Sequence, residues 1–294
     1  MIGRRERARG RVAVVRKTVA VVRRISLLVL LILLAGCGRS ADDYTKQANE
    51  YLKKGDLDNA IVQFEKATRA APDNYEAQNS LGAALSMRGD FARATEHFRR
   101  AVALKDDFLE GHYNLGRALT ETGDPQGAIG EFRRVIQLDS TYALAYLSAG
   151  GVYMRLGMGE RAVEAYRLAL RYDPNLTQVY ANLASAYVGL QRYDDAINVL
   201  LEVKARDPRN AEIASMVGRI AILKKDFGQA IEYLREASSL APGDLVVRND
   251  LGTALMLSGL KDEAIAQWEQ ILAMDPGPEL KDAVNGNLAR ARSQ

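Results

Sequence analysis

The sequence predicts an all-α solenoid, in which similar helical pairs stack in one direction instead of folding around a single central core. Two observations predict it. A 34-residue unit recurs seven times, without insertion or deletion, from residue 41 to residue 278, and every copy contains two short amphipathic stretches. One such unit cannot bury its apolar face alone, so consecutive copies must pack against each other.

The copy at residues 143–176 shows the pattern most clearly. In each half of this copy, small and apolar residues recur three or four positions apart, which is the spacing of one face of an α-helix. These residues are Tyr146, Ala149, Gly150 and Tyr153, then Ala162, Tyr166 and Ala169. The second helix of this copy is expected to end at Asp173-Pro174, because proline cannot continue a helix and biases the preceding residue away from α geometry. Each copy is therefore predicted to be a helix–turn–helix.

At three positions of the repeat, the size class of the side chain is the same in every copy. The eighth is small in every copy: Ala48, Gly82, Gly116, Gly150, Ala184, Gly218 and Gly252. The twentieth is always alanine: Ala60, Ala94, Ala128, Ala162, Ala196, Ala230 and Ala264. The twenty-fourth is large: Phe64, Phe98, Phe132, Tyr166, Leu200, Leu234 and Trp268. The small residues let paired helices approach closely, and the large residue fills the space between one pair and the next.

This pattern resembles the tetratricopeptide repeat family. The seven copies are 41–74, 75–108, 109–142, 143–176, 177–210, 211–244 and 245–278. The resemblance implies a right-handed superhelix whose first helices line a concave groove, and it implies binding of proteins or peptides in that groove. Residues 279–294 predict one more helix, with an apolar stripe of Leu280, Val284, Leu288 and Ala291. Because the last repeat would otherwise expose its stacking face, this helix is predicted to be a cap.

The first 36 residues predict a secretory signal peptide. They carry nine Lys and Arg residues and one glutamate, and residues 25–35 form an apolar run broken only by Ser26. Eleven residues are too few to span a bilayer, which needs roughly twenty. A basic region followed by a short apolar stretch and small residues is typical of a signal peptide.

Leu34-Ala35-Gly36-Cys37 resembles the lipobox of bacterial lipoproteins, and Cys37 is the only cysteine of the chain. The resemblance implies cleavage before Cys37 and acylation of its thiol and new amino group, which supplies the several chains that stable anchoring needs. Two alternatives remain open. The chain is cut nearby as an ordinary signal peptide, or it keeps an uncleaved short anchor in the inner membrane.

A lipidated Cys37 places the protein in the bacterial cell envelope. Gly38 follows it instead of aspartate, and by the sorting pattern of enteric bacteria this favours an outer-membrane lipoprotein facing the periplasm over the inner membrane. Residues 37–40 then form a tether that reaches little more than about 10 Å. The first repeat is therefore expected close to the membrane. Ser40 and Asp43 predict an N-terminal cap on its first helix.

The resemblance assigns the groove to positions two, five, six, nine, twelve and thirteen of each copy. These positions are polar in the first two copies: Asp42, Thr45, Asn49, Lys53, Glu76, Asn79 and Ser80. Further along they become apolar: Tyr113, Leu144, Leu147, Met154, Val188, Met216, Ile222, Leu223 and Met256. The candidate partner-binding residues are Tyr113, Asn114, Arg117, Leu147, Met154, Arg155, Asn182, Met216, Arg219 and Ile222.

Each type of candidate residue has a binding interpretation and an alternative. Methionines adapt to a partner surface, but positions twelve and thirteen are alternatively half-buried against the next repeat, and Met256 and Leu257 lie under the cap. The asparagines bind a peptide backbone in other members of the family, but they also belong to the ordinary repeat consensus. The arginines can bind a carboxylate with two parallel hydrogen bonds, or they are simply solvated.

Composition gives little support for other functions. Residues 37–294 hold 31 basic and 36 acidic residues, a net charge near −5, with no nucleic-acid footprint. One cysteine excludes an internal disulfide, and two histidines leave little for a metal site. We predict no enzyme activity, cofactor or metal, because no nucleophile–base pair or phosphate loop is present. His112 and Trp268 are predicted to lie in the core, and His97 in solvent.

The sequence thus predicts a membrane-anchored scaffold that binds envelope proteins. The combination of lipobox and repeats resembles lipoproteins that assist pilus secretin assembly, polysaccharide export or peptidoglycan processing. The alternatives are an inner-membrane protein with an uncleaved N-terminal segment, or an accessory subunit of an envelope enzyme. The oligomeric state is open.

Overall fold

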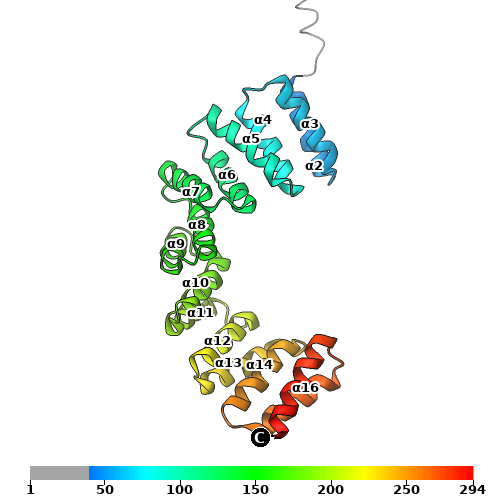
Figure 1. The fold of residues 1–294 in the computed structure, drawn as a ribbon, viewed down its shortest axis with the longest axis vertical. Helices are drawn as coiled ribbons and strands as arrows, with labels where there is room; N and C mark the ends of the chain where they lie inside the picture. Colours follow the sequence, from blue (N-terminus) through cyan, green and yellow to red (C-terminus); the bar gives the residue numbers. More distant parts are fainter. Residues whose placement is uncertain (1–39, 294) are drawn as a thin grey trace, which may run out of the picture. The chain divides into compact units, whose positions relative to one another are not determined.

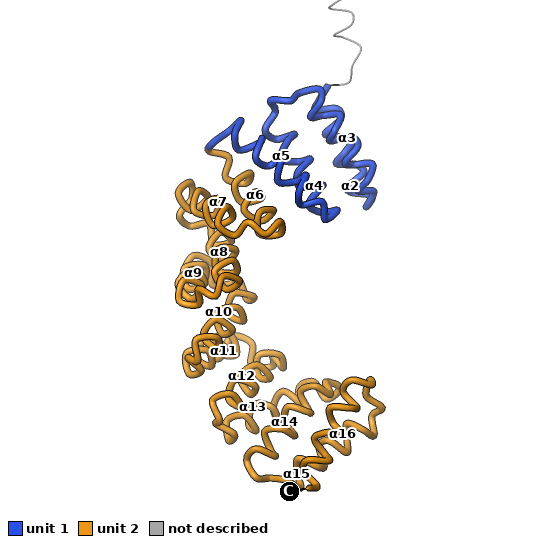
Figure 2. The backbone as a smooth tube through the Cα atoms, in the orientation of Figure 1, with its two compact units in different colours: residues 1–106 blue, residues 107–294 orange. Residues whose placement is uncertain are grey.

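The computed structural model describes residues 40–293, and its fifteen regular elements in that range are all α-helices (Figure 1). They follow one another as seven helix–turn–helix pairs and a final single helix, which confirms the predicted fold class. The chain divides into two compact units, residues 1–106 and residues 107–294 (Figure 2). The predicted signal peptide and the predicted lipidation site, Cys37, lie outside the described residues. Within the described part, no helix is both long and apolar enough to cross a membrane.

Unit 1 contains two helical pairs. The first is α2 (Ala41–Lys53) with α3 (Leu57–Ala70), and the second is α4 (Tyr75–Met87) with α5 (Phe91–Leu104). The hydroxyl of Ser40 accepts the backbone N–H of Asp43 at 3.1 Å, while the Asp43 carboxylate accepts the backbone N–H of Ser40 at 3.1 Å. This reciprocal capping box satisfies two donors at the start of α2, as the sequence predicts.

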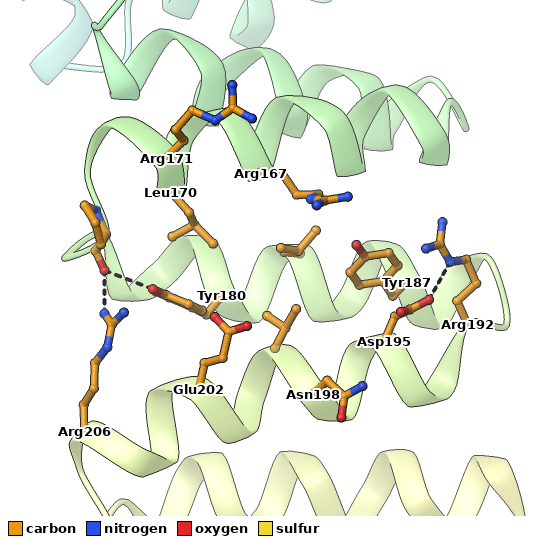
Figure 3. A pocket seen from close by; sticks show the side chains of 13 residues that line it. Arg167, Leu170, Arg171, Tyr180, Tyr187, Arg192, Asp195, Asn198, Glu202 and Arg206 are labelled. Carbon is orange, nitrogen blue, oxygen red and sulfur yellow. Dashed lines mark hydrogen bonds and ion pairs between the residues drawn. The ribbon is translucent and has the colours of Figure 1, made fainter.

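Unit 2 contains five pairs and the last helix. The pairs are α6 (Leu109–Thr122) with α7 (Pro125–Leu138), α8 (Ala143–Arg155) with α9 (Gly159–Tyr172), α10 (Thr177–Gly189) with α11 (Tyr193–Arg206), α12 (Ala211–Lys224) with α13 (Phe227–Leu240), and α14 (Leu245–Leu257) with α15 (Lys261–Ala273). The last helix is α16 (Pro278–Ser293). Consecutive pairs pack together, and Figure 3 shows one junction, formed by α9, α10 and α11, from close by.

The turn inside each pair depends on one left-handed residue at the fifteenth position of the repeat. This residue is Gly55, Gly89, Gly123, Gly157 or Gly259 in five copies, with φ between 69° and 88°. In the other two copies it is Gln191, with φ 59°, and Lys225, with φ 65°. Glycine enters this region without the steric penalty that a Cβ brings. Gln191 and Lys225 therefore keep the same turn at a conformational cost.

The small and large positions face each other within each pair, whereas the sequence pattern predicts that the large residue fills the space between one pair and the next. A Cβ placed on Gly150 would lie 2.5 Å from Cε1 of Tyr166, and one placed on Gly252 would lie 2.5 Å from Nε1 of Trp268. Since interiors are packed like crystals of organic molecules, glycine at this position sets how closely the two helices approach. The large residues are buried in all seven copies.

The helix α16 covers the end of the last repeat. Val284, Leu288 and Ala291 are buried on its inner side, and Leu280 packs against the same cluster. The Nε1–H of Trp268 and the Nδ2–H of Asn287 both donate to Oδ1 of Asn249, each at 3.1 Å. One amide oxygen on α14 therefore joins α15 and α16, which supports the capping role.

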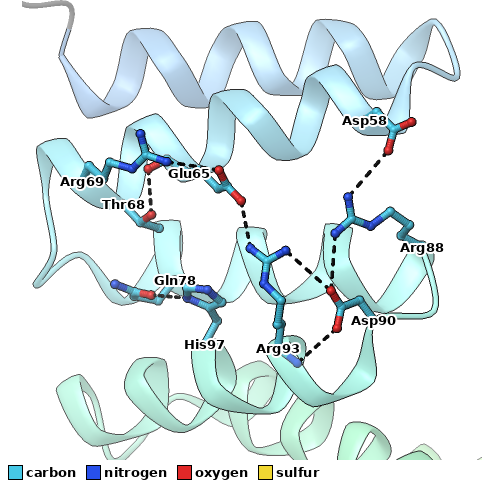
Figure 4. A network of polar contacts seen from close by, with 9 residues as sticks. All are labelled: Asp58, Glu65, Thr68, Arg69, Gln78, Arg88, Asp90, Arg93 and His97. Carbon is cyan, nitrogen blue, oxygen red and sulfur yellow. Dashed lines mark hydrogen bonds and ion pairs between the residues drawn. The ribbon is translucent and has the colours of Figure 1, made fainter.

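Ion pairs join the two helical pairs of unit 1 (Figure 4). Glu65 on α3 accepts a hydrogen bond from Arg93 on α5 at 2.8 Å, and Arg88 lies 3.6 Å from Asp58. In unit 2, Arg235 and Glu263 occupy the same two repeat positions as Glu65 and Arg93 with the charges exchanged, and they lie 2.6 Å apart. The repeat thus offers a site for an ion pair between consecutive second helices.

His97 corrects one prediction. The sequence places it in solvent, but it is half-buried, and its Nδ1 lies 2.8 Å from Oε1 of Gln78. The Gln78 amide donates from its Nε2 to the carbonyl of Pro72 at 2.9 Å, so its oxygen faces the ring, and Nδ1 of His97 is the donor (Figure 4). Burial lowers the pKa of His97, and the positive charges of Arg100 and Arg93 lower it further. His97 is therefore a packing residue between α4 and α5.

Candidate protein-binding groove

All ten candidate partner-binding residues lie on first helices of unit 2. They are distributed over four helices: Tyr113, Asn114 and Arg117 on α6; Leu147, Met154 and Arg155 on α8; Asn182 on α10; Met216, Arg219 and Ile222 on α12. Arg117, Arg155, Asn182 and Arg219 are exposed, and the other six are half-buried. In unit 1 one predicted groove residue is misplaced, because Asn79 is buried.

The four aliphatic candidates lie partly in the core. Leu147, Met154 and Met216 pack against the buried cluster of the middle repeats, and Ile222 packs against the cluster of the last repeats. Each keeps some exposed surface, so each is available for a contact, but packing alone accounts for most of its apolar character. Met154 and Ile222, at position twelve, therefore agree with the half-buried interpretation, whereas Leu223 and Leu257, at position thirteen, are exposed and contradict it.

The apolar side chains that are most exposed on first helices of unit 2 lie further along the chain. Leu223 on α12 is 53% exposed, and Val246 and Leu257 on α14 are 52% and 51% exposed. Val246 and Leu257 are eleven residues apart, which is close to three helical turns, so both lie on one face of α14. Leu257 is thus not covered by the cap, and a grouping of exposed apolar residues of this kind marks an interaction site.

Tyr113 is held by its neighbours on the floor of the predicted groove. Its ring lies 5.4 Å from that of Tyr142 and 6.0 Å from that of Phe132, and the Arg117 guanidinium lies 5.8 Å from its centroid. The hydroxyl of Ser148 on α8 donates to its phenol oxygen at 3.5 Å. The ring is therefore preorganised, which lowers the entropic cost of using it to bind a ligand.

The exposed arginines already have partners within unit 2. Arg155 donates from Nη1 to the carbonyl of Thr120 at 3.0 Å, which joins α8 to α6. Nε of Arg219 lies 3.3 Å from the Asp250 carboxylate, which joins α12 to α14. Burial raises the pKa of Asp250, while the charge of Arg219 opposes this shift. Both arginines thus hold neighbouring first helices together and still expose part of the side chain.

The two residues that the sequence places in the core, His112 and Trp268, are structural. His112 is buried, as predicted, and its Nδ1 lies 2.6 Å from Oε2 of Glu131 on the paired helix. Trp268 is also buried, as predicted. Within residues 40–293, no group of three or more His, Cys, Asp or Glu side chains is arranged to hold a metal ion. The candidate partner-binding residues form an extended surface of side chains on the first helices of unit 2.

Models of the tetratricopeptide repeat match most of the chain. One matches residues 45–107, 87–143 and 113–176, and another matches residues 154–220 and 221–291. The chain belongs to the tetratricopeptide repeat family. The proteins described by these models are scaffolds that bind proteins or peptides and are typically not catalytic. The chain is therefore a repeat scaffold of the protein-binding type.

Solved tetratricopeptide repeat structures share this fold. The chain is 30% identical in sequence to MamA in its crystal structure. The match covers 56% of this chain and 96% of that one, with a TM-score of 0.53. It is 22% identical to PilW, a widely conserved type IV pilus biogenesis factor, over 73% and 98% of the two chains, with a TM-score of 0.60. It is 18% identical to YrrB, a repeat protein with an unusual peptide-binding site, over 63% and 95%, with a TM-score of 0.53. No curated protein sequence matches the chain.

Proposed function

We propose that the protein is a lipid-anchored adaptor of the bacterial envelope that binds partner proteins or peptides along the first helices of its repeats. The exposed apolar residues Leu223, Val246 and Leu257 carry this proposal, because a repeat scaffold that buries its core so fully has no packing reason to expose them. The half-buried Leu147, Met154, Met216 and Ile222 extend the same surface toward the middle of unit 2. The partner belongs to a machine that the adaptor helps to assemble.

The resemblance to a solved structure narrows the choice of envelope pathway in which the adaptor acts. PilW is a type IV pilus biogenesis factor of similar fold, and the lipobox at Cys37 fits a pilus or secretion assembly factor of the outer membrane. Polysaccharide export and peptidoglycan processing are the other assemblies in which such an adaptor would act. Anchoring raises the effective concentration of the groove near membrane partners, so modest affinities suffice.

The groove is tested by charge substitution with crosslinking. A photo-crosslinker at position 147 or 216 should trap a defined envelope protein in intact cells. The double variant L223E/L257E should reduce that product at least tenfold, because it places two charges in a desolvated contact. Both leucines are about half exposed, so folding should be retained, as circular dichroism would show.

The matched control is Leu104→Glu, which changes a leucine that is 42% exposed on a second helix. It should leave crosslinking unchanged. If L223E/L257E kept the full product, or if only second-helix positions gave products, the groove assignment would be wrong. Individual groove substitutions, Leu147→Glu and Met216→Glu, should give smaller, graded losses.

The anchor is tested by the mass of the protein extracted from membranes. We expect a form that lacks residues 1–36 and carries added acyl chains on Cys37. The Cys37→Ala variant should lose that acyl mass and leave the membrane fraction or remain unprocessed. A wild-type protein that keeps its nine basic N-terminal residues would instead establish the uncleaved inner-membrane anchor.

A further inference from the structure

A hollow of about 470 Å³ opens between the second helices of repeats four and five, on residues that no groove position includes (Figure 3). Leu170 and two arginines of α9 form one wall, and Asp195, Glu202 and Arg206 of α11, with Arg192 at its N-cap, form the other. The floor is the side of α10 that carries the buried rings of Tyr180 and Tyr187. The hollow therefore combines an apolar, aromatic floor with a charged rim.

Two of its arginines are fixed over the floor. The Arg206 guanidinium lies 5.4 Å from the centroid of the Tyr180 ring, and both side chains donate to the carbonyl of Pro174, at 2.9 Å and 3.2 Å (Figure 3). The Arg192 guanidinium lies 4.6 Å from the Tyr187 centroid and donates from Nε to Asp195 at 2.8 Å. These positive charges are in place before any ligand arrives.

The other two arginines have no partner among the described residues. Arg167 and Arg171 lie four residues apart on α9, so they are neighbours on one face of the helix. Arg167 and Asp195 occupy the two repeat positions that form an ion pair at other junctions. Those ion pairs are Glu65 with Arg93, and Arg235 with Glu263. Those two pairs form ion pairs of 2.8 Å and 2.6 Å, but here Asp195 is engaged by Arg192. The site of the expected ion pair is thus open, with an unpaired guanidinium beside it.

The preceding junction has a similar opening. A hollow of about 340 Å³ lies between α7 and α9, and there both positions of the ion pair hold arginine, Arg133 and Arg161. Arg161 lies 6.0 Å from the Tyr153 centroid, and Arg133 has no partner among the described residues. Glu164 is the acidic residue of this hollow. Two consecutive junctions of the second-helix face therefore carry an excess of arginine, although residues 37–294 are acidic overall.

We propose that the hollow between α9 and α11 is a second binding site, and that its ligand is an acidic segment of a protein partner with two carboxylates flanking an apolar side chain. Four arginines against two carboxylates leave the rim with a net charge of +2. Arginine pairs with carboxylates through two parallel hydrogen bonds. Alternate residues of an extended peptide are roughly 6.6 Å apart, which matches side chains one helical turn apart, about 5–6 Å at their Cβ atoms. Successive side chains of an extended segment point to opposite sides, so the apolar side chain between two carboxylates that face α9 points toward Val199 of α11.

The test uses a fluorescein-labelled peptide made of two copies of Ser-Glu-Leu-Glu-Ser-Gly, with fluorescence anisotropy as the readout. The control peptide has glutamine at every glutamate. We expect the full-length protein to bind the acidic peptide at least tenfold more tightly, and we expect added salt to weaken that binding. The double variant R167Q/R171Q should lose at least tenfold in affinity. It should stay folded, because neither arginine has a partner among the described residues.

The matched control is R99Q/R100Q, which removes from α5 two exposed arginines that have no partner within residues 40–293 and that are far from the hollow in sequence. It should bind the acidic peptide as the wild type does. Glu202→Gln removes a rim carboxylate without a partner among the described residues, and it should tighten binding two- to fivefold. L223E/L257E should have no effect, which separates this site from the groove.

Equal binding of the acidic and glutamine peptides would overturn the proposal. So would an equal loss in R99Q/R100Q, because the attraction would then be a general charge effect. If phosphatidylglycerol vesicles bound through Arg167 and Arg171 while the peptide did not, the site would be a lipid site, and the assignment to a protein segment would be wrong.

Discussion

Replacing Trp268 by alanine should cost about 3–5 kcal/mol of the free energy of unfolding, the range for removing a large buried aromatic side chain. The side chain is 2% exposed and fills the space against Gly252 at the last pair. It also donates to Asn249, the residue that holds Asn287 of α16. The substitution should therefore loosen both α15 and the cap.

Hydrogen exchange is the measurement, because the stability of a solenoid is a sum of local terms and unfolding can begin at one end. Amide protection should fall in α14, α15 and α16 and remain near wild type in unit 1. Trp268→Phe is the control: Phe64, Phe98 and Phe132 occupy the same repeat position, so it should cost much less. Protection that fell equally along the whole chain would contradict the local model.

The fold was predictable from the sequence because every copy of the repeat carries similar packing and turn signals. Each copy places a small residue opposite a large one, and each pair ends where a proline, asparagine or aspartate limits helical geometry. Seven agreeing copies outweigh any local ambiguity. The turn at position fifteen is less obvious, because Gln191 and Lys225 take a left-handed conformation that only glycine would have indicated.

The candidate site was predictable only in outline. Family positions placed the candidate residues on first helices correctly, but they could not say how deeply each would pack. Leu147 and Met216 are half-buried, whereas Val246 and Leu257, which are not among the ten candidates, are more exposed. Exposure depends on how far a neighbouring repeat covers each position, and this is set by side chains 34 residues away.

The hollow on the second helices was missed for a different reason. Sequence spacing alone would pair Arg167 with Asp195, as Glu65 pairs with Arg93. The choice of partner depends on side-chain geometry: Arg192 lies three residues from Asp195 on the same turn and takes its carboxylate. His97 is a similar case, since its contact with Gln78 on the paired helix removes it from solvent.

Gly150→Ala should destabilise the fourth repeat, because the added Cβ would lie 2.5 Å from the Tyr166 ring. Overpacking of this kind costs about 1–3 kcal/mol, which more than offsets the gain of up to about 1 kcal/mol from the higher helix propensity of alanine. Tyr166→Leu should destabilise the same repeat for the opposite reason, since it leaves a cavity of about the size of the lost ring atoms. Urea unfolding of each single variant would measure both losses.

The double variant G150A/Y166L should recover most of the combined loss. It recreates the pair Ala184 and Leu200 that the next repeat carries, where both side chains are fully buried. A favourable coupling energy of about 1–3 kcal/mol is therefore expected in the double-mutant cycle. If the two losses simply added, the eighth and twenty-fourth positions would act independently, and the spacing of the helices would be set by other contacts. Recovery would instead show that the sum of these two side-chain sizes determines how closely each pair of helices packs.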